Sequence, residues 1–261
     1  GAGSPVRIGA PLSFVLAAAA LAIVLLWLAM RFYDFRMVPP RIGMSEAPCA
    51  QFDRANGQHQ SHYDWAQLCT FDADNSRIAK SGARPTLVMI GDSLTWRWDI
   101  AQPGIVMRGI PGQTSAQLLV RFRQDVVALR PQAVHILVGT NDIAGNSGPS
   151  NPERVIANIA SMVDLAQANG IVPIVATVPP AKSFSWAGGI KPYPWIDRLN
   201  AQIRELAKER GLLLADYHAE LVGPDGRFRS GLYEDEAHPN RAGYARMRPV
   251  LDVTIARALA D

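Results

Sequence analysis

From Pro85 onward, short apolar runs alternate with longer amphipathic stretches, and this alternation constrains the fold more than any other feature of the sequence. The apolar runs have the length and composition of buried strands, at residues 86–90, 104–108, 133–138, 171–177 and 212–215. Periodic or capped stretches predict helices at residues 115–129, 151–170, 195–210 and 240–259. Because strands that alternate with helices form a parallel sheet covered on both faces, the sequence predicts an α/β domain.

An uncharged apolar run precedes this domain. Residues 12–30 carry no charge and are flanked by Arg7 and Arg31. As a helix, the run would be roughly 28 Å long, close to the ~30 Å hydrocarbon core of a bilayer. It therefore predicts a transmembrane anchor. A cleaved signal peptide is the main alternative, although its apolar region is usually shorter and the residues after the run make a poor cleavage site. A buried core helix is the third interpretation.

The side of the membrane is indicated by two opposing features. Three arginines after the apolar run outnumber Arg7 before it, which alone would place the rest of the chain in the cytoplasm. Cys49 and Cys69 are the only two cysteines, and a disulfide between them would persist only in an oxidising compartment. Such a bridge would contribute roughly 3 kcal/mol, whereas the alternative is two unconnected buried thiols. We expect an extracytoplasmic catalytic domain, periplasmic or at the cell surface.

These features divide the chain into three parts: an anchor at 1–31, a polar stalk and capping segment at 32–83, and a catalytic domain at 84–261. The formal net charge of +3 is too small to imply a nucleic-acid partner, and no basic cluster with interleaved aromatic residues is present in the sequence. These features predict a membrane, reached through the N-terminal helix, as a partner, and no nucleic acid.

Candidate reactive residues follow three of the predicted strands. Ser93 follows the first, Gly112 the second and Asn141 the third, and the carboxyl ends of parallel strands meet at one edge of the sheet. Each has an ordinary alternative, namely a helix N-cap, a turn glycine and a turn former. Together they predict the parts of one site. Ser93 would be a nucleophile whose own N–H group begins a helix and faces a developing oxyanion. Gly112 would offer that oxyanion a second backbone N–H without an obstructing side chain, and Asn141 would offer it a side-chain amide. Thr95 excludes the Gly-x-Ser-x-Gly elbow of α/β-hydrolases.

One histidine has an acid placed for it. Asp235 precedes His238 by three residues, a spacing that brings both side chains onto one face of a turn. The carboxylate can then keep one imidazole nitrogen protonated and leave the other free to accept a serine proton. Glu234 and Glu236 are alternative partners for the imidazole. The other histidines are interpreted as a core residue (His135), a residue without an acid (His218) and two residues of a polar segment (His59 and His62), so no metal or cofactor site is predicted.

Four blocks of the chain together resemble those of the GDSL, or SGNH, hydrolase family: Gly-Asp-Ser-Leu at 91–94, Gly-Ile-Pro-Gly-Gln-Thr at 109–114, Gly-Thr-Asn-Asp at 139–142 and Asp-x-x-His-Pro-Asn at 235–240. The resemblance covers residues from about 85 to 258. It implies a flavodoxin-like three-layer α/β/α fold with a five-stranded parallel sheet, and hydrolysis of carboxylic esters or thioesters.

The same resemblance assigns a role to each candidate residue. Ser93 is the nucleophile, and Asp235 with His238 completes the triad. The amides of Ser93 and Gly112, with the side chain of Asn141, form the oxyanion hole. None of these positions departs from the family's pattern.

The substrate is indicated by aromatic residues near the predicted site. Residues 179–194 form a long connection after the fourth strand, and connections of that length are often functional lids. Three tryptophans are candidate substrate-binding residues: Trp186 in this connection, Trp195 directly after it, and Trp96 after the nucleophile. They are interpreted either as a surface for a sugar or acyl group, or as a cover for the edge of the sheet. We expect short acyl or O-acetyl esters of a lipid or carbohydrate. An O-acyltransferase acting on an envelope sugar, and a non-catalytic carbohydrate-binding relative, are the alternatives.

Overall fold

The computed structural model describes residues 12–37, 44, 48–49, 64–223 and 225–260. The chain divides into two compact units, residues 1–63 and 64–261, which are described separately below. Much of the predicted stalk, with His59 and His62, lies outside the described residues. Cys49 and Cys69 are both disulfide-bonded, so the alternative of two unconnected thiols is wrong.

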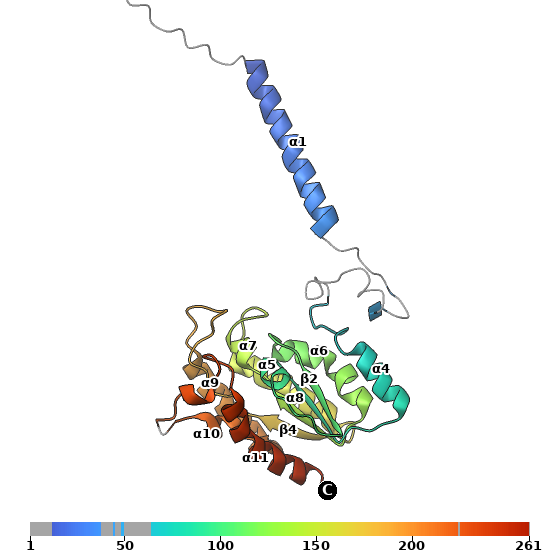
Figure 1. The fold of residues 1–261 in the computed structure, drawn as a ribbon, viewed down its shortest axis with the longest axis vertical. Helices are drawn as coiled ribbons and strands as arrows, with labels where there is room; N and C mark the ends of the chain where they lie inside the picture. The colour runs from blue at the N-terminus through green and yellow to red at the C-terminus, as the bar shows by residue number, and fades with distance from the viewer. Residues whose placement is uncertain (1–11, 38–43, 45–47, 50–63, 224, 261) are drawn as a thin grey trace, which may run out of the picture. The chain divides into compact units, whose positions relative to one another are not determined.

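The first unit contains one long helix, α1 (Leu12–Met37), drawn in blue in Figure 1. The large apolar side chains described along it, between residues 15 and 30, are exposed. Within the ranges that the structure describes, no helix is both long enough and apolar enough to cross a membrane. The apolar run is therefore helical as predicted, but its assignment as a transmembrane helix is not confirmed.

The second unit is built on a five-stranded sheet: β1 (Leu87–Gly91), β2 (Ile105–Gly109), β3 (Ala133–Leu137), β4 (Val172–Ala176) and β5 (Leu213–Ala215). All neighbouring strands are parallel, and their order is β2-β1-β3-β4-β5. This is the flavodoxin-like order, in which β2 is added on one side of β1 and the later strands are added on the other, so that the strand order reverses between β1 and β3. The predicted α/β fold with a five-stranded parallel sheet is confirmed.

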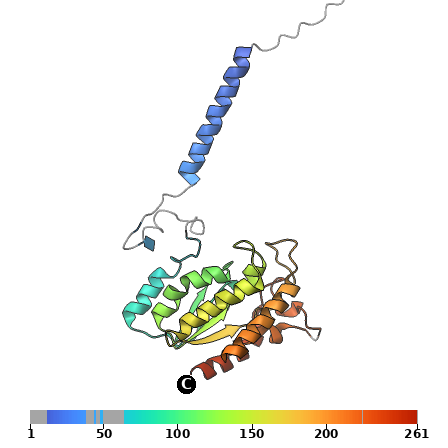
Figure 2. The same ribbon diagram turned by 180° about the vertical axis from the view of Figure 1, so that it is seen from behind.

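Helices cover both faces of the sheet (Figures 1 and 2). Leu87 and Met89 of β1 point into one apolar cluster, whereas Val88 and Ile90 point into the other, because side chains alternate along a strand. The second of these clusters is closed by α4 (Asp72–Ser81), α6 (Ser115–Asp125), α8 (Pro152–Gln167) and α9 (Pro192–Arg210). The first is closed by α5 (Ser93–Trp96), α10 (Tyr217–Leu221) and α11 (Arg241–Ala258).

Capping residues place the helix ends close to their predicted positions. The side chain of Asn151 caps α8 by accepting from the amide of Arg154, and Gly170 after that helix has a φ of +67°. The stretch 115–129 is not one helix, because α6 ends at Asp125 and a 3₁₀ turn (Val127–Leu129) follows. The helix predicted from residue 195 begins earlier, so that the connection between β4 and α9 ends at Lys191.

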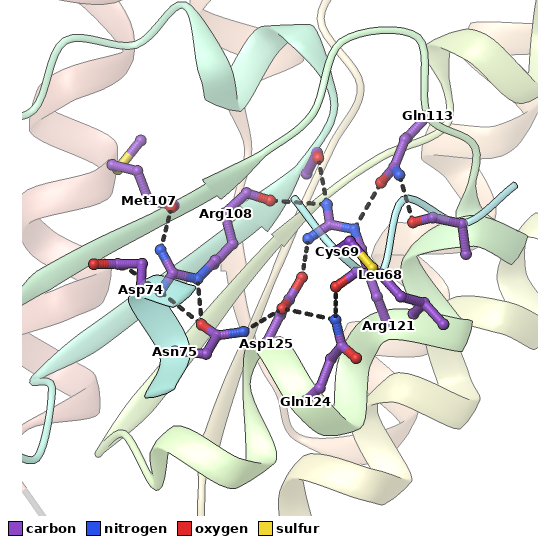
Figure 3. A network of polar contacts seen from close by, with 12 residues as sticks. Leu68, Cys69, Asp74, Asn75, Met107, Arg108, Gln113, Arg121, Gln124 and Asp125 are labelled. Carbon is purple, nitrogen blue, oxygen red and sulfur yellow. Dashed lines mark hydrogen bonds and ion pairs between the residues drawn. The ribbon is translucent and has the colours of Figure 1, made fainter. Parts of the chain in front are cut away.

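Residues 64–81 pack on the catalytic domain, and the boundary predicted at 83/84 therefore lies inside the second unit. Three glutamines donate to backbone carbonyls of this segment: Gln113 to Ala66, Gln117 to Trp65 and Gln124 to Leu68. Arg108 at the end of β2 donates to Asp74 and Asn75 of α4 (Figure 3). We call residues 64–81 the capping segment. It is held by polar contacts with β2, with α6 and with the connection between them.

Candidate active site

Ser93 is the first residue of α5, directly beyond the carboxyl end of β1. The helix N-cap is Asp92, whose carboxylate accepts from the amide of Leu94 at 2.9 Å, so Ser93 is not the capping residue. A Cβ at Gly91 would lie 2.1 Å from the hydroxyl oxygen of Thr95. Glycine is thus needed because α5 approaches β1 closely.

Ser93, His238 and Asp235 form a continuous hydrogen-bonded series. The hydroxyl oxygen of Ser93 lies 2.9 Å from Nε2 of His238, and Nδ1 of His238 lies 2.8 Å from Oδ2 of Asp235. The other carboxylate oxygen of Asp235 accepts from the amides of Ala237 and His238, each at 2.7 Å. The turn therefore fixes the carboxylate, the carboxylate fixes the imidazole, and Nε2 is left facing the serine.

The charge state of Asp235 suits this arrangement. Burial raises the pKa of the Asp235 carboxyl, but hydrogen bonds from Ala237 and His238 outweigh burial and hold the pKa below its ordinary value. The alternative acids have other partners: Glu234 lies 2.8 Å from Arg97, and Glu236 lies 2.6 Å from Lys182. Asp235 is the carboxylate that contacts His238.

The remaining described histidines lie elsewhere. His135 is buried in β3, where Nε2 lies 2.9 Å from the hydroxyl of Tyr217, and burial lowers its pKa to about 3. Burial also lowers the pKa of His218, whose Nε2 is 3.7 Å from Asp197. Over the residues that the structure describes, no group of three or more histidine, cysteine or acidic side chains is arranged to hold a metal ion.

A pocket of about 220 Å³ opens above the serine. It is lined by Ser93, Trp96, Arg97, Pro111, Gly112, Asn141, Asn146, Trp186 and His238. Gly112 has a φ of +81°, in the left-handed region that glycine favours, and a Cβ there would approach only Asn146, at 3.7 Å. The predicted residues of the oxyanion hole, with two of the three predicted tryptophans, therefore surround one cavity.

Asn141 belongs to α7 (Thr140–Ile143), which follows β3, and its side chain is almost fully buried. Its amide nitrogen donates to the carbonyl of Gln113 at 3.0 Å and to the carboxylate of Asp92 at 3.2 Å. Its amide oxygen accepts from the side chain of Asn146 at 2.9 Å. The side chain is thus held in one orientation, with the donor nitrogen on the side of the residue that precedes Ser93.

The neighbouring acid has a different role. Asp142 accepts from the amide of Ser115 at 2.9 Å and from its hydroxyl at 2.6 Å, and so holds the first turn of α6. Burial raises the pKa of this carboxyl. Asp142 therefore binds the start of a helix that is distant in sequence.

Trp195 is not part of the pocket above Ser93. It lines a separate cavity of about 440 Å³, together with residues of the α7–α8 connection and with Gly189, Ile190 and Lys191. Trp96 and Trp186 are both partly exposed at the pocket itself. A substrate above Ser93 therefore meets these two indoles.

Several residues of the site were not found from the sequence, among them Arg97, which lines the pocket, and two that hold Asn141. Gln113 holds Asn141 through its carbonyl, and its side chain accepts from the buried guanidinium of Arg121 at 2.6 Å. Arg121 also donates to the carbonyls of Gly91 and Arg108 at the ends of β1 and β2 (Figure 3). Asn146, in the turn after α7, is the second. Gln113 lies inside a recognised block, whereas no sequence pattern marks Asn146.

Comparisons with known proteins agree with this geometry. Residues 81–246 match the family model described as the GDSL-like Lipase/Acylhydrolase family. The chain is similar to a GDSL-like lipase from Bacteroides thetaiotaomicron, with 36% sequence identity, a TM-score of 0.69, and coverage of 75% of this chain and 100% of that one. The acetylxylan esterase Axe2 of Geobacillus stearothermophilus shares the fold, with 21% identity and a TM-score of 0.52 over 65% of this chain and 93% of that one.

A lipoprotein is also similar to part of the chain. The Bacillus subtilis lipoprotein YqeF is 28% identical over 154 residues, which cover 51% of this chain. The chain spans 60% of the length of that relative.

Proposed function

Because the chain belongs to the GDSL-like lipase/acylhydrolase family and is a carboxylic ester hydrolase, we propose that it cleaves its substrate through an acyl-enzyme intermediate on Ser93. The observation that carries this proposal is the continuous contact from Ser93 to His238 to Asp235, at 2.9 Å and 2.8 Å. A nucleophile, a base and a group that orients the base are the parts that acyl transfer requires.

In the first half-reaction, Nε2 of His238 accepts the hydroxyl proton while Oγ of Ser93 attacks the ester carbonyl carbon. The carbonyl oxygen becomes an oxyanion, which the amides of Ser93 and Gly112 and the side chain of Asn141 stabilise. The tetrahedral intermediate then collapses, and His238 returns the proton to the leaving alkoxide. In the second half-reaction, His238 deprotonates a water molecule that attacks the acyl-enzyme, and the carboxylic acid leaves as Ser93 regains its proton.

We further propose that the acyl group is short and the alcohol is a carbohydrate. The pocket above Ser93 is small, about 220 Å³, which suits an acetyl or similarly short group. Trp96 and Trp186 present partly exposed indoles beside it, and such rings offer flat apolar faces on which a sugar can stack. A long lipid chain would have to leave the pocket and lie on the outside.

The experiment that tests this proposal compares the wild-type enzyme with Ser93→Ala on aryl acetate, butyrate and decanoate esters. Removal of a triad nucleophile lowers turnover by about 10⁴-fold or more, so activity should fall to near background. The wild type should prefer acetate to decanoate and should not respond to chelators. Undiminished turnover by Ser93→Ala would exclude the mechanism. Analysis of products with an added sugar acceptor separates hydrolysis from acyl transfer, because transfer would give an acylated sugar.

We also propose that the protein is associated with a membrane outside the cytoplasm. The exposed apolar side chains of α1 and the description of a relative as a lipoprotein support the association, and the disulfide-bonded cysteines support an oxidising compartment. Cell fractionation with and without detergent tests the first statement, and protease treatment of intact spheroplasts tests the second. Recovery of the full chain in the soluble fraction would contradict the association.

A further inference from the structure

Asn146 lies outside all four recognised sequence blocks, yet its side chain contacts both residues that flank Ser93 in the proposed oxyanion hole. Its amide nitrogen donates to the carbonyl of Gly112 at 3.0 Å and to the amide oxygen of Asn141 at 2.9 Å. Its amide oxygen accepts from the indole nitrogen of Trp186 at 3.1 Å. One side chain therefore joins two proposed oxyanion donors to an aromatic wall of the pocket.

The contact with Asn141 determines which end of that amide can serve as a donor. A side-chain amide has an acceptor end and a donor end of nearly equal size. Because Asn146 presents a donor, only the oxygen of Asn141 can face it, and the nitrogen of Asn141 must then point to the opposite side. There it lies 3.0 Å from the carbonyl of Gln113 and 3.2 Å from Asp92, the residue before Ser93. Without Asn146, the Asn141 amide would lose the partner of its oxygen.

The contact with Gly112 restrains a residue that has no side chain of its own. Gly112 has a φ of +81°, and in that region glycine is conformationally free. The bond from Asn146 to its carbonyl limits this freedom and so helps to fix the direction of its N–H group. Asn146 thus acts on both proposed donors at once.

The third contact extends this arrangement to the connection between β4 and α9. Trp186 lies on that connection, with its ring 5.2 Å from Phe184, which is buried, and 5.9 Å from His238. Its indole nitrogen provides the bond to Asn146. A displacement of Trp186 would therefore remove one of the three hydrogen bonds made by the side chain of Asn146.

We propose that Asn146 is a positioning residue that aligns Asn141 and Gly112 as oxyanion donors, and that the indole nitrogen of Trp186 supports this alignment from the pocket wall. The inference rests on the proposed function, because it requires an oxyanion to form at Ser93. Asn146 acts through other groups and takes no part in bond making. Its effect should therefore fall on the transition state rather than on the bound substrate.

The test uses Asn146→Ala, Trp186→Phe and their double variant in the full-length enzyme, with kcat and KM measured on an aryl acetate. Asn146→Ala should lower kcat by about 10-fold to 100-fold and change KM by less than about 3-fold, as expected for an interaction made in the transition state. Trp186→Phe keeps an aromatic ring and removes the N–H donor, so it should lower kcat by a smaller factor. In the Asn146→Ala background, Trp186→Phe should have no further effect on kcat.

Two further variants sharpen the result. Asn146→Asp keeps an acceptor for Trp186 but removes both donors, and it should lower kcat at least as much as Asn146→Ala. Trp195→Phe is the matched control, because Trp195 lines the separate cavity, and its effect should be small and should add to that of Asn146→Ala. Thermal unfolding of each variant shows whether the fold is kept.

A higher KM at unchanged kcat would overturn the inference, since Asn146 would then be a ground-state substrate contact. Equal effects of Trp186→Phe with and without Asn146 would overturn the part assigned to Trp186. If Ser93→Ala is inactive while the Asn146 variants keep full kcat, only this inference fails. If Ser93→Ala is fully active, the proposed function fails instead.

Discussion

The side-chain amide of Asn141 donates to the carboxylate of Asp92, with 3.2 Å between Nδ2 and Oδ2. The same nitrogen donates to the carbonyl of Gln113 at 3.0 Å, so both of its protons have acceptors before any substrate binds. An oxyanion formed at Ser93 must compete with one of these acceptors. The bond to Asp92 is the longer of the two.

The first prediction concerns the contribution of Asn141 to the rate. Loss of one oxyanion donor typically lowers kcat by about 10²-fold to 10³-fold. Asn141→Ala should therefore lower kcat by that factor and leave KM nearly unchanged, as steady-state kinetics on an aryl acetate would show. An increase in KM alone would mean that Asn141 binds the ground state of the substrate.

The second prediction concerns the imidazole tautomer. Asp235→Asn keeps an oxygen that can accept from the amides of Ala237 and His238, but it presents an N–H₂ group to Nδ1 of His238. The ring would then be held with the wrong nitrogen protonated, and kcat should fall by about 10²-fold to 10⁴-fold while the thermal midpoint stays close to wild type.

The matched control for this variant is Asp235→Ala. It removes the acceptor of both backbone amides as well as the partner of the ring, so it should lower the thermal midpoint in addition to kcat. If Asp235→Asn retains wild-type kcat, the carboxylate supports only the turn.

The third prediction separates the histidines. His238→Ala should abolish turnover, whereas His218→Ala should leave kcat and KM near wild type, because His218 lies by Asp197 rather than by Ser93. Activity of the two purified variants on the same ester gives the comparison. If His218→Ala were inactive and His238→Ala active, the base would instead be His218, which follows β5.

Local patterns in the sequence predicted the sheet and the series from Ser93 to Asp235. The strands were visible because parallel strands are buried on both faces and read as apolar runs, as β1 does, with every residue buried. Asp235 and His238 were paired correctly because their contact depends on a spacing of three residues within one turn.

The contacts that sequence reasoning missed or misjudged depend on residues distant in the chain. Gly91 is required in part by its approach to the carbonyl of Leu137 on the neighbouring strand β3, and this contact leaves no local pattern in the sequence. Asn146 meets Gly112 and Trp186 across separations of 34 and 40 residues. These relationships come from the packing of three loops at one sheet edge, which local periodicity does not encode.

The fourth prediction concerns the capping segment. A protein that begins at residue 64 should keep wild-type kcat, since the second unit starts there. One that begins at residue 84 would lose the apolar contacts of the buried Ile78 and the carbonyl that Gln113 binds. It should be less stable by about 2–5 kcal/mol in urea unfolding and should have a lower kcat.

The protein that begins at residue 64 should carry Cys69→Ser, because its deletion removes Cys49 and would leave a thiol, whereas the protein that begins at residue 84 contains neither cysteine. The full-length chain with both cysteines replaced by serine is the control for the loss of the disulfide. Equal stability of the two truncated proteins would show that residues 64–83 are dispensable.

The last prediction concerns Asp92 and the dependence of stability on pH. Burial, together with the nearby charge of Asp142, raises the pKa of this carboxyl from 3.8 to about 7, against the opposing effect of hydrogen bonds from Leu94 and Asn141. Below pH 3.8, Asp92 is protonated in both the folded and the unfolded chain. Between that pH and about 7, the unfolded chain gives up the proton and the folded chain keeps it, so the stability that Asp92 contributes declines as pH rises and levels off above the folded pKa.

Asp92→Asn removes this ionisation and retains an oxygen that can accept from Leu94. The difference in unfolding free energy between the variant and the wild type should therefore shift in favour of the variant as pH rises from 4 to 7, by at most about 4 kcal/mol, and should stay constant above pH 8. Urea unfolding at pH 4, 5.5, 7 and 8.5 measures the difference directly. Because any fixed cost of the substitution is the same at every pH, only the slope of the difference reports the ionisation. A difference that does not change with pH would show that Asp92 is ionised in the folded enzyme across this range, and that its contact with Asn141 is a charged one throughout.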